Sequence, residues 1–579
     1  MQTKRINISA WLRLFTTSIT FAVLYTQISV GQSNYQEVAS DLGVNVMLSG
    51  GHYGSGVSLY DWDEDGWPDI SFGNVGGPPI FYHNDSGTFN EVDFNIPNTH
   101  QIMAILWVDY DNDLDPDLFI TRKYGPWSLY QNDGAFQFTD VTNSSGLGQI
   151  EVYDTYGASW GDIDNDGNLD LYICTYYFMS SVENFLFKNN GNGTFTDISI
   201  TSGASDGSRT SFQSAFFDNN EDGFVDLYVI NDREMGNGLY ENNGDGTFDN
   251  ISASSGVEAN VNAMSNTIGD YDNDGDFDIY VTNSIPGNVL LQNNGNGTFS
   301  DYTATAEVSV FDECWGAIFS DHDLDGWMDL FVGSTGLLPD SVHENHFFMN
   351  EQDGTFDFIE ESGFQNLPSF TYCSAAGDLD NDGDEDFVLT CDTPYVNEIW
   401  RNVSPSQNGY LKVNLHGIIS NSGGIGSRVT CYANDLIQTK FSRCGDQYLS
   451  QNSQYLTFGL GNASMVDSVT VAWPSGVVDV IESVSINQML TVTEGMSNVT
   501  VGLEQNDVMD EPFAMNENGI QLNRSVQQLS VFDVSGKLIT SFNKQSRGHL
   551  KLNLLPKGVY IVQWIELNRQ VGTSKFCLF

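Results

Sequence analysis

One acidic phrase, Asp-x-Asp-x-Asp-Gly-x-x-Asp, recurs seven times along this chain, twice with one substitution. Successive copies start roughly 50 residues apart, a period typical of propeller blades. Each copy leads directly into an apolar, β-rich segment such as 171–174 or 279–281. Apolar runs of this kind are typical of strands buried on both faces. The repeat therefore predicts an all-β chain that uses the same loop and the same buried strand in every unit.

The fixed positions of the phrase carry the oxygen ligands that Ca²⁺ prefers. Ca²⁺ takes six to eight hard oxygens at about 2.4 Å, which one tight loop can offer from the side chains of positions 1, 3, 5 and 9 and the carbonyl of position 7. Glycine at position 6 permits the bend. We predict up to seven structural calcium ions. The candidate ligand residues, at positions 1, 3, 5, 7 and 9 of successive loops, are Asp61, Asp63, Asp65, Trp67 and Asp69; Asp109, Asp111, Asp113, Asp115 and Asp117; Asp162, Asp164, Asp166, Asn168 and Asp170; Asp218, Asn220, Asp222, Phe224 and Asp226; Asp270, Asp272, Asp274, Asp276 and Asp278; Asp321, Asp323, Asp325, Trp327 and Asp329; and Asp378, Asp380, Asp382, Asp384 and Asp386.

Two copies depart from the pattern. The loop that starts at Asp218 has Asn220 at position 3, and the loop that starts at Asp109 has Leu114 where glycine belongs, so we expect both to bind more weakly. An EF-hand would need a bidentate acid at position 12 and a helix on each side, whereas position 12 is apolar in every copy. The loops could also be merely solvated acidic turns, but their recurrence in register disfavours that interpretation.

A second phrase keeps the same period and joins an Asn-Gly or Asp-Gly turn to an aromatic strand, as in 189–195, 242–248 and 293–299. Such dipeptides mark tight hairpins. After the seventh acidic loop the chain reaches Asn402 without this turn and strand. Residues 35–39 resemble the missing strand, so we expect the N-terminal strand to complete the last blade and close the ring, which hides sheet edges.

These loops and turns resemble the FG-GAP and VCBS repeats, the calcium-loop propellers related to the integrin α-subunit head. The resemblance implies a seven-bladed β-propeller over residues 32–405. It does not specify a ligand, because related propellers are adhesins, carbohydrate-binding modules or parts of polysaccharide lyases.

Two smaller β-rich units are expected after the propeller. The segments 421–429, 456–461 and 473–476 resemble an ASPIC/UnbV domain, assigned here to residues 406–497, a family without established chemistry. A polar linker follows at 498–512. Residues 513–579 are basic and resemble the C-terminal sorting domain of the Bacteroidetes type IX secretion system, a small β-sandwich, which implies that secretion machinery as a partner. A plain Ig-like accessory domain is the alternative, and cleavage of the tail stays open.

The N-terminus and the charge indicate export. Lys4, Arg5 and Arg13 precede a largely apolar stretch, and small residues follow at 29–31, so residues 1–31 are predicted to be a signal peptide. A membrane anchor is disfavoured because the run is short and contains threonines, and no later segment is long and apolar enough to span a bilayer. The net charge of −56 argues against binding nucleic acid. We expect a secreted or outer-surface protein.

The sequence contains no convincing catalytic motif. The Gly-x-Ser-x-Gly match around Ser159 falls in an expected strand and lacks the strand-to-helix turn of a nucleophile elbow. His343 and His346 are too weak a pair for a zinc site. Among the seven cysteines, Cys373 and Cys391 lie equidistant from the centre of the last loop, and a disulfide between them is left open.

The favoured function is therefore a calcium-binding protein for adhesion or binding, with a surface glycan or a protein as its ligand. The alternative is an extracellular polysaccharide-active enzyme, of lyase or glycosidase type, that uses carboxylates on the axial face of the propeller. We favour a binding role over an enzymatic one, and the sequence does not name the ligand.

Overall fold

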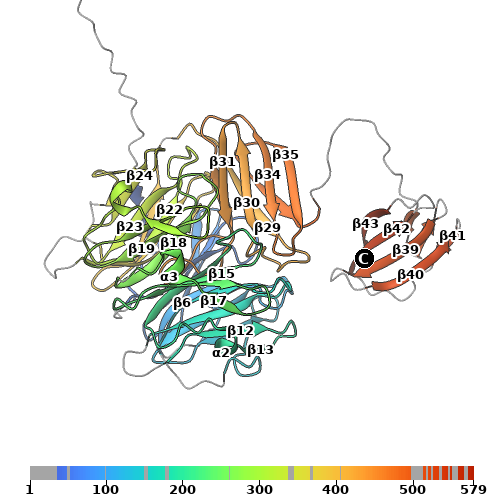
Figure 1. Cartoon of the computed structure of the whole chain (residues 1–579), viewed down its shortest axis with the longest axis horizontal. Helices are drawn as coiled ribbons and strands as arrows, with labels where there is room; N and C mark the ends of the chain where they lie inside the picture. Colours follow the sequence, from blue (N-terminus) through green and yellow to red (C-terminus); the bar gives the residue numbers. More distant parts are fainter. Residues whose placement is uncertain are drawn as a thin grey trace, which may run out of the picture.

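The computed structural model describes residues 35–48, 53–97, 100–148, 154–176, 182–259, 261–336, 344–364, 369–404 and 406–496, together with the backbone of seven strands between residues 513 and 578. The predicted signal peptide and linker lie outside these residues. The described chain is almost all β, as predicted (Figure 1). Its helices are single turns, namely α1 (Ala39–Leu42), α2 (Ser199–Ser202), α3 (Ser252–Ser255) and α4 (Thr303–Ala306).

Each acidic phrase joins the first and second strands of its own antiparallel sheet. The first strands are β2 (Val57–Tyr60), β6 (Gln101–Val108), β10 (Thr155–Gly161), β14 (Ser211–Phe217), β18 (Ala263–Gly269), β22 (Cys314–Ser320) and β26 (Thr371–Gly377). The second strands are β3 (Asp69–Phe72), β7 (Asp117–Lys123), β11 (Asp170–Thr175), β15 (Asp226–Asn231), β19 (Asp278–Asn283), β23 (Asp329–Ser334) and β27 (Asp386–Cys391). Every residue of the second strands is buried, as the apolar runs predicted.

The third and fourth strands form the predicted hairpins. The third strands are β4 (Ile80–Asp85), β8 (Ser128–Asn132), β12 (Phe185–Asn189), β16 (Gly238–Asn242), β20 (Val289–Asn293), β24 (His346–Asn350) and β28 (Glu398–Asn402). The fourth strands are β5 (Thr88–Val92), β9 (Phe138–Asp140), β13 (Phe195–Asp197), β17 (Phe248–Asn250), β21 (Phe299–Asp301) and β25 (Phe356–Phe358). The last sheet takes its fourth strand from the N-terminus.

That N-terminal strand, β1 (Tyr35–Glu37), pairs antiparallel with β28 and places Tyr35 opposite Asn402. The Tyr35 ring stacks on Phe387 of the same sheet with centroids 5.0 Å apart. A helical turn follows β1, as α2, α3 and α4 follow their fourth strands. The prediction that the N-terminal strand completes the last sheet is confirmed.

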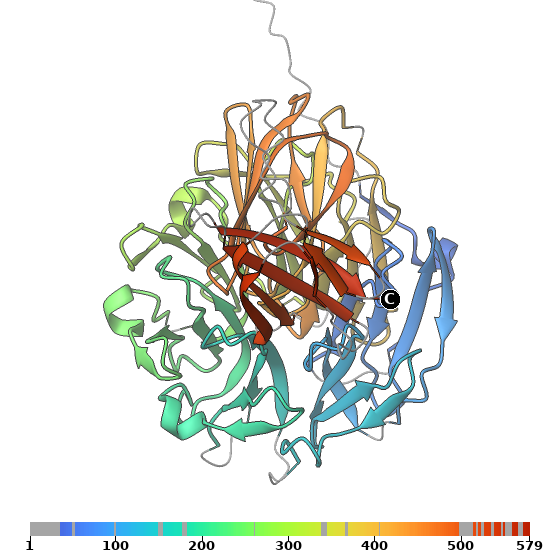
Figure 2. The ribbon, with the colours of Figure 1, turned by 90° about the vertical axis from the view of Figure 1, so that its right-hand side faces the viewer.

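The sheets are arranged around a common centre (Figure 2). The first strands of neighbouring sheets pack against one another, and β26 packs against β2, so that the series returns to its start. Asparagines that end the third strands join neighbouring sheets: Asn189 Nδ2 donates to Tyr110 O at 2.8 Å, and Asn84 Nδ2 donates to Leu379 O at 3.0 Å. These features agree with the propeller resemblance, while the number of blades stays a prediction.

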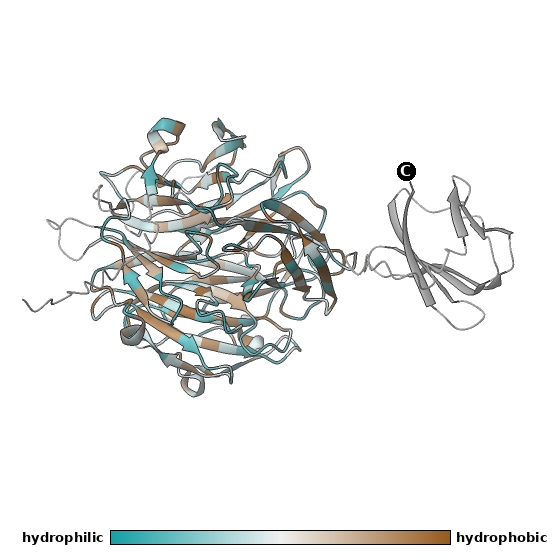
Figure 3. Cartoon of the chain, turned by 90° about the horizontal axis from the view of Figure 1, so that it is seen from above, coloured by the Kyte–Doolittle hydropathy of each residue, from teal (hydrophilic) through white to brown (hydrophobic). Residues whose placement is uncertain are grey.

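A second unit follows the propeller. One of its sheets contains β29 (Tyr410–His416), β33 (Leu456–Gly459) and β36 (Gln488–Thr493). The other contains β30 (Arg428–Ala433), β31 (Leu436–Phe441), β34 (Val466–Ala472) and β35 (Val478–Val484). Their apolar faces form a core of their own around Val429, Val469 and Trp473. Hydrophobic stretches lie within the strands of both units (Figure 3). We call residues 406–496 the C-terminal module.

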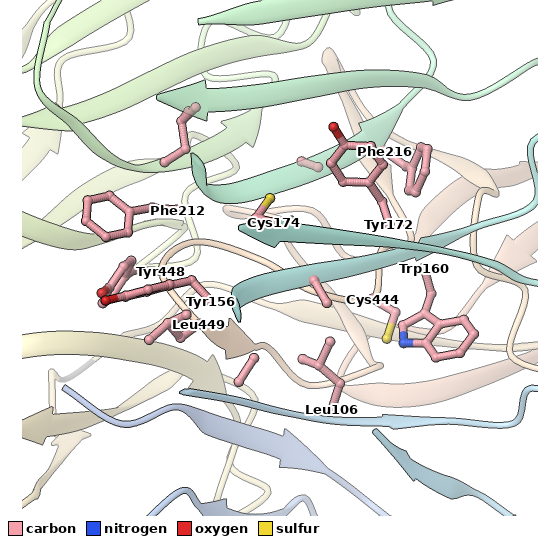
Figure 4. Packing of buried hydrophobic residues seen from close by; sticks show 14 of the residues in the cluster. Leu106, Tyr156, Trp160, Tyr172, Cys174, Phe212, Phe216, Cys444, Tyr448 and Leu449 are labelled. Atoms are coloured by element: carbon pink, nitrogen blue, oxygen red, sulfur yellow. The ribbon is translucent and has the colours of Figure 1, made fainter. Parts of the chain in front are cut away.

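Part of this module enters the centre of the propeller. Residues 442–456, here called the plug, contain β32 (Ser450–Gln451), which pairs in parallel with the innermost strand β2. The plug also accepts a hydrogen bond at Cys444 O from Trp160 N, at 3.0 Å. Figure 4 shows Tyr448 and Leu449 among aromatic side chains of the propeller. The plug is therefore part of the propeller's own hydrophobic core.

The cysteine prediction needs a correction. Cys373 and Cys391 are buried free thiols. The regular register of this hairpin, which pairs Gly377 with Asp386, places Cys373 opposite Thr390. A register shift beyond Cys373 leaves Cys391 opposite Thr371, so the two thiols are not cross-strand partners. Equal spacing from Asp382 missed that the strand pairing is centred between Asn381 and Asp382. The expectation for Ser159 is confirmed, because it lies in β10 and its hydroxyl is 2.7 Å from Ser214 Oγ.

The C-terminal segment has two described sheets. They contain β37 (Phe513–Asn516), β38 (Gly519–Leu522) and β41 (Gly548–Leu550), and β39 (Val526–Asp533), β40 (Leu538–Gln545), β42 (Gly558–Ile565) and β43 (Val571–Leu578). In the part of the chain that the structure describes, no helix is long and apolar enough to cross a membrane.

Candidate metal centres

The acidic phrases fold into similar loops, which we number 1 to 7 in chain order. Carboxylate oxygens of positions 1, 3 and 9 lie within 4.8 Å of one another in loops 1, 2, 3 and 5. These groups are Asp61, Asp63 and Asp69; Asp109, Asp111 and Asp117; Asp162, Asp164 and Asp170; and Asp270, Asp272 and Asp278. The structure thus brings together residues that the sequence predicted as ligands.

Position 1 is held by the backbone of its own loop. In loop 1, Asp61 Oδ1 accepts the N–H of Asp65 at 3.1 Å and Asp61 Oδ2 accepts that of Gly66 at 2.7 Å. The same two contacts recur at Asp109, Asp162, Asp218, Asp321 and Asp378, and Asp270 keeps the second. The turn therefore orients this carboxylate before any cation binds.

The acid at position 9 is almost completely buried in every loop. Asp69 has no exposed surface; its Oδ1 accepts the N–H of Asn84 at 2.7 Å, and its Oδ2 accepts that of Trp62 at 3.1 Å. Equivalent pairs of N–H groups hold Asp117, Asp170, Asp226, Asp278, Asp329 and Asp386. An acid that starts a buried strand in every copy is expected to serve a charged partner.

Positions 5 and 7 are arranged differently. The Oδ1 of each position-5 acid accepts the N–H of position 7, as from Trp67 to Asp65 at 2.9 Å. The other position-5 acids are Asp113, Asp166, Asp222, Asp274, Asp325 and Asp382. Most position-7 side chains, among them Asp115, Asn168, Asp276 and Trp327, are half-buried, whereas Asp384 is buried. Phe224 covers the following turn, where a Cβ on Gly244 would lie 2.8 Å from its ring.

The backbone conformation at position 6 shows the effect of Leu114, one of the two departures from the pattern. Its glycines have positive φ, for example 92° at Gly66 and 105° at Gly383. Leu114 in loop 2 takes the same conformation with φ 74° and is 69% exposed. A left-handed backbone is unfavourable for a residue with a Cβ. Loop 2 therefore keeps its geometry against a conformational cost, and its weaker binding stays a prediction.

Loop 4 differs in the way that its substitution suggests. Asn220 Oδ1 accepts the N–H of Asp222 at 3.1 Å, and Asn220 Nδ2 donates to Asp222 Oδ2 at 3.1 Å. The exposed amide thus hydrogen-bonds to an acid of its own loop and adds no negative charge to it. The weaker binding of this loop stays a prediction.

The buried carboxylates fit a cation. Carboxylate oxygens with no hydrogen-bond partner are buried in four loops, at Asp111, Asp164, Asp270, Asp272, Asp380 and Asp384. Burial raises the pKa of Asp69 and Asp117 to about 9 and that of Asp270 to about 8. Burial without a counter-charge disfavours the ionised form of an acid. A divalent cation would restore it, and oxygen-only ligands are those that calcium prefers.

Sequence reasoning missed several residues of these sites. Side chains of the third strand contact the position-3 acid: His83 Nε2 lies 3.0 Å from Asp63 Oδ2, and Gln292 Nε2 donates to Asp272 Oδ2 at 2.6 Å. Gln131, Lys188 and Arg401 lie similarly at Asp111, Asp164 and Asp380. Asp384 was counted only for its carbonyl, but its buried carboxylate has a pKa raised to about 10, by burial and then by Asp382.

The C-terminal module lies against the loops. Tyr455 OH donates to Asp61 Oδ2 at 2.5 Å, and Ser422 Oγ donates to Asp109 Oδ2 at 2.5 Å. Lys412 Nζ, in a side chain 4% exposed, lies 2.8 Å from Asp378 Oδ2. No sequence signal pointed to these contacts, because the module has no counterpart of the repeat.

Comparison with known families agrees with this architecture. The FG-GAP-like repeat matches residues 61–120, 109–173, 218–281 and 270–332; ASPIC and UnbV matches 417–499; and the secretion system C-terminal sorting domain matches 514–578. The chain thus contains FG-GAP-like repeats, an ASPIC/UnbV domain and a type IX secretion sorting domain, as predicted. The sorting domain makes it a secreted or outer-surface protein.

Individual relatives are more distant. Cartilage acidic protein 1 of Xenopus tropicalis is 27% identical over 305 residues, which cover 50% of this chain and 46% of that protein. The match therefore spans about half the length of the relative. Among solved structures, Sqt1 of Saccharomyces cerevisiae aligns with a TM-score of 0.40 at 9% identity, covering 62% of this chain and 99% of that one. The extracellular domain of BT4673 from B. thetaiotaomicron aligns with a TM-score of 0.39 at 12% identity, covering 91% and 67%.

Proposed function

We propose that this protein is a secreted, calcium-stabilised propeller that acts as a binding or adhesion protein at the outer cell surface, with a glycan or a protein as its ligand. The observation that carries the calcium proposal is the set of buried carboxylate oxygens without partners in the loops, at Asp270 and Asp272 among others. The repeats and the sorting tail support the extracellular role.

The calcium in this proposal is structural. Positions 1, 3 and 9 would hold the ion with the position-5 acid, and the ion would supply positive charge that keeps these acids together. Without it, acids within 4.8 Å of one another repel. Because each loop connects the innermost strand to the next strand of its sheet, this repulsion acts on the propeller core.

We propose that the ligand binds at the end of the propeller opposite the calcium loops. In every sheet, positions 1 to 8 of the acidic phrase form the loop between the first and second strands, so this connection has a constant length. The connections between second and third strands, at the opposite end of each sheet, range from 124–127 to 335–345. Connections of variable length commonly carry binding residues on a constant scaffold.

An aromatic and charged group of side chains supports this choice. Tyr53 lies 5.7 Å from Trp315 and 6.0 Å from Tyr156, measured between ring centroids. Lys123 Nζ lies 4.6 Å from the centroid of the Tyr53 ring and 5.3 Å from that of Tyr124, which is 67% exposed. Trp315 and Tyr156 are buried and support the group from below, while the exposed Tyr124 and the half-buried Tyr53 offer aromatic faces beside a charged group. Such faces suit the apolar faces and hydroxyls of sugars.

The alternative is a polysaccharide-active enzyme with axial carboxylates. On the loop side, the centre of the propeller is filled by the plug, and Asp61 already accepts from Tyr455. On the opposite side, Asp232 Oδ2 accepts from Tyr176 OH at 2.7 Å and pairs with Arg233 at 3.7 Å. Asp61 and Asp232 thus have structural partners, one at each end of the centre, and we favour binding over catalysis.

Chelation tests the calcium proposal. The melting temperature of the full chain should fall strongly when calcium is removed, because each occupied site stabilises the fold by about 2.7 kcal/mol at a hundredfold excess over Kd. Elemental analysis of the same samples reports the calcium content. An unchanged melting temperature in protein that elemental analysis shows to be free of calcium contradicts the proposal.

A glycan array tests the ligand proposal. Tyr124→Ala and Arg233→Ala should lose binding relative to Ile437→Ala, a control at an exposed module residue. Product analysis of the same incubations tests the alternative, since cleaved oligosaccharides would identify an enzyme. Equal binding by all three variants would place the ligand elsewhere.

A further inference from the structure

The first observation concerns where the C-terminal module contacts the loops. Its Tyr455 and Ser422 hydroxyls each donate to the Oδ2 of a position-1 acid, Asp61 in loop 1 and Asp109 in loop 2. Both oxygens also accept a backbone N–H from position 6 of their loop. A module side chain and the loop backbone therefore fix the same carboxylate oxygen. The other oxygen of each carboxylate accepts the position-5 backbone N–H and, among the described residues, no second hydrogen bond.

The second observation concerns links between neighbouring loops. Where position 4 is asparagine, its amide donates to the position-6 carbonyl of the next loop. Asn112 reaches Gly167 O, Asn165 reaches Gly223 O and Asn273 reaches Gly326 O, each at 2.9 Å, and Asn381 reaches Gly66 O at 3.0 Å. The last of these joins loop 7 to loop 1. The loops are thus coupled to one another as well as to their own sheets.

The module completes one link that the propeller lacks. Loop 4 has Glu221 at position 4, which cannot donate to the carbonyl of loop 5. Arg428 of the module lies between them: its Nη2 is 2.6 Å from Glu221 Oε1 and also donates to Gly275 O. A charge-assisted contact from the module thus takes the place of the asparagine.

The third observation is that the module is anchored at the propeller centre, so these contacts are held in place. Tyr448, in the middle of the plug sequence, donates its hydroxyl to Tyr53 O at 3.0 Å. A Cβ on Gly56 would lie 2.5 Å from Leu449 O, so the plug backbone packs directly on the propeller backbone. Gln451 Nε2 donates to Trp107 O at 2.9 Å in the buried centre.

We propose that the C-terminal module is a component of the calcium centres, in which Tyr455 and Ser422 position the first ligand of loops 1 and 2 and Arg428 joins loops 4 and 5. Calcium binding and seating of the plug then stabilise each other, because a coupling between two binding events is reciprocal. This inference rests on the proposed calcium binding. Tyr455 and Ser422 are positioning residues, which act through Asp61 and Asp109.

The test uses native mass spectrometry of the full chain at buffered free calcium. Tyr455→Phe and Ser422→Ala should each shift the midpoint for one bound ion about tenfold to higher calcium, the size expected for losing a hydrogen bond to a charged group. The midpoints of the other ions should not move. Tyr432→Phe is the control, since Tyr432 lies in β30 and pairs with Ile437 and Ser468 inside the module.

Hydrogen exchange tests the reciprocal effect. Removing calcium should increase exchange of the plug peptide, residues 442–456, before the strands of the propeller exchange. If Tyr455→Phe does not fold, Ser422→Ala, which alters a half-buried residue, carries the same test. Wild-type protein that binds no calcium would contradict the proposed function. Calcium-binding wild type with midpoints unchanged in both variants, or a plug that stays protected without calcium, would overturn the coupling alone.

Discussion

Replacing Asp272 with alanine should reverse the sign of its stability effect when calcium is removed. Asp272 occupies position 3 of loop 5, where Oδ2 accepts from Gln292 at 2.6 Å and Oδ1 is buried without a partner. Burial, and then the charge of Asp274, raises its pKa. The carboxylate is thus unfavourable in the empty loop and becomes favourable only beside a cation.

The magnitude follows from occupancy. At a calcium concentration a hundredfold above Kd, a filled site stabilises the fold by about 2.7 kcal/mol, so emptying loop 5 should cost roughly that amount. Loss of the Gln292 hydrogen bond adds little to this cost, because Gln292 is half-buried and its amide can hydrogen-bond to water instead. In calcium-free buffer the same substitution removes repulsion within the loop and should leave stability unchanged or increased.

Asn220→Ala is the matched control, since it removes a neutral, exposed position-3 oxygen from loop 4. We expect it to change stability by about 0.5 kcal/mol or less in either buffer. Denaturant unfolding of wild type and both variants, with and without calcium, measures the difference. If Asp272→Ala is equally destabilising in both buffers, the carboxylate has a packing role and the charge argument is wrong. Equal calcium affinities of the two variants in calorimetric titration would contradict it as well.

Three further outcomes follow from the structure. Because burial raises the pKa of Asp69 to about 9 and of Asp226 to about 8, far above the unfolded value near 4, these groups stabilise calcium-free protein at low pH. That contribution is lost between about pH 4 and pH 9 as they ionise, so calcium-depleted protein should melt higher at pH 5 than at pH 8 and calcium-loaded protein should not. Leu114→Gly should stabilise calcium-loaded protein by about 1 kcal/mol, because it removes a leucine from a left-handed backbone conformation. An unchanged denaturation midpoint would contradict this expectation. Deleting residues from Glu511 onward should leave calcium binding intact and block export, so normal surface display in a fractionated host would show that the tail is an ordinary domain.

Local repetition made most of the loops predictable. The spacing of the acids and the burial of the following strand both depend on neighbours in sequence, so the clustering of Asp270 and the burial of Val281 could be predicted together. The N-terminal strand was predictable because one repeat lacked its last piece and Tyr35 supplied it. The contacts of Asn84 and its equivalents had a signal that was missed. An asparagine stands at or next to the end of the third strand of each sheet, but it was interpreted only as part of a turn.

Other features had no local signal. The last hairpin pairs Gly377 with Asp386 and shifts its register by one residue between Thr371 and Cys373, which spacing alone cannot reveal. This register places neither of the two thiols that were considered as a disulfide opposite the other. Tyr455 and Asp61 are 394 positions apart. Contacts of this kind depend on how two folded units pack together. In a module without repeats, the sequence around a tyrosine does not indicate which residue it contacts.

Because of the plug, the change of sequence pattern near residue 405 does not separate two independent folding units. The sequence changes its pattern there, and residues 410–493 have a core of their own, yet the buried segment around Tyr448 belongs to the propeller core. Removing the module would expose aromatic side chains that now line the centre, such as Phe212 and Trp315. Since apolar surface is stabilised by burial, the propeller and the module are interdependent even where their sequences are unrelated. The module occupies the end near the acidic loops, where Tyr455 contacts Asp61, and this is why we propose the ligand site at the opposite end.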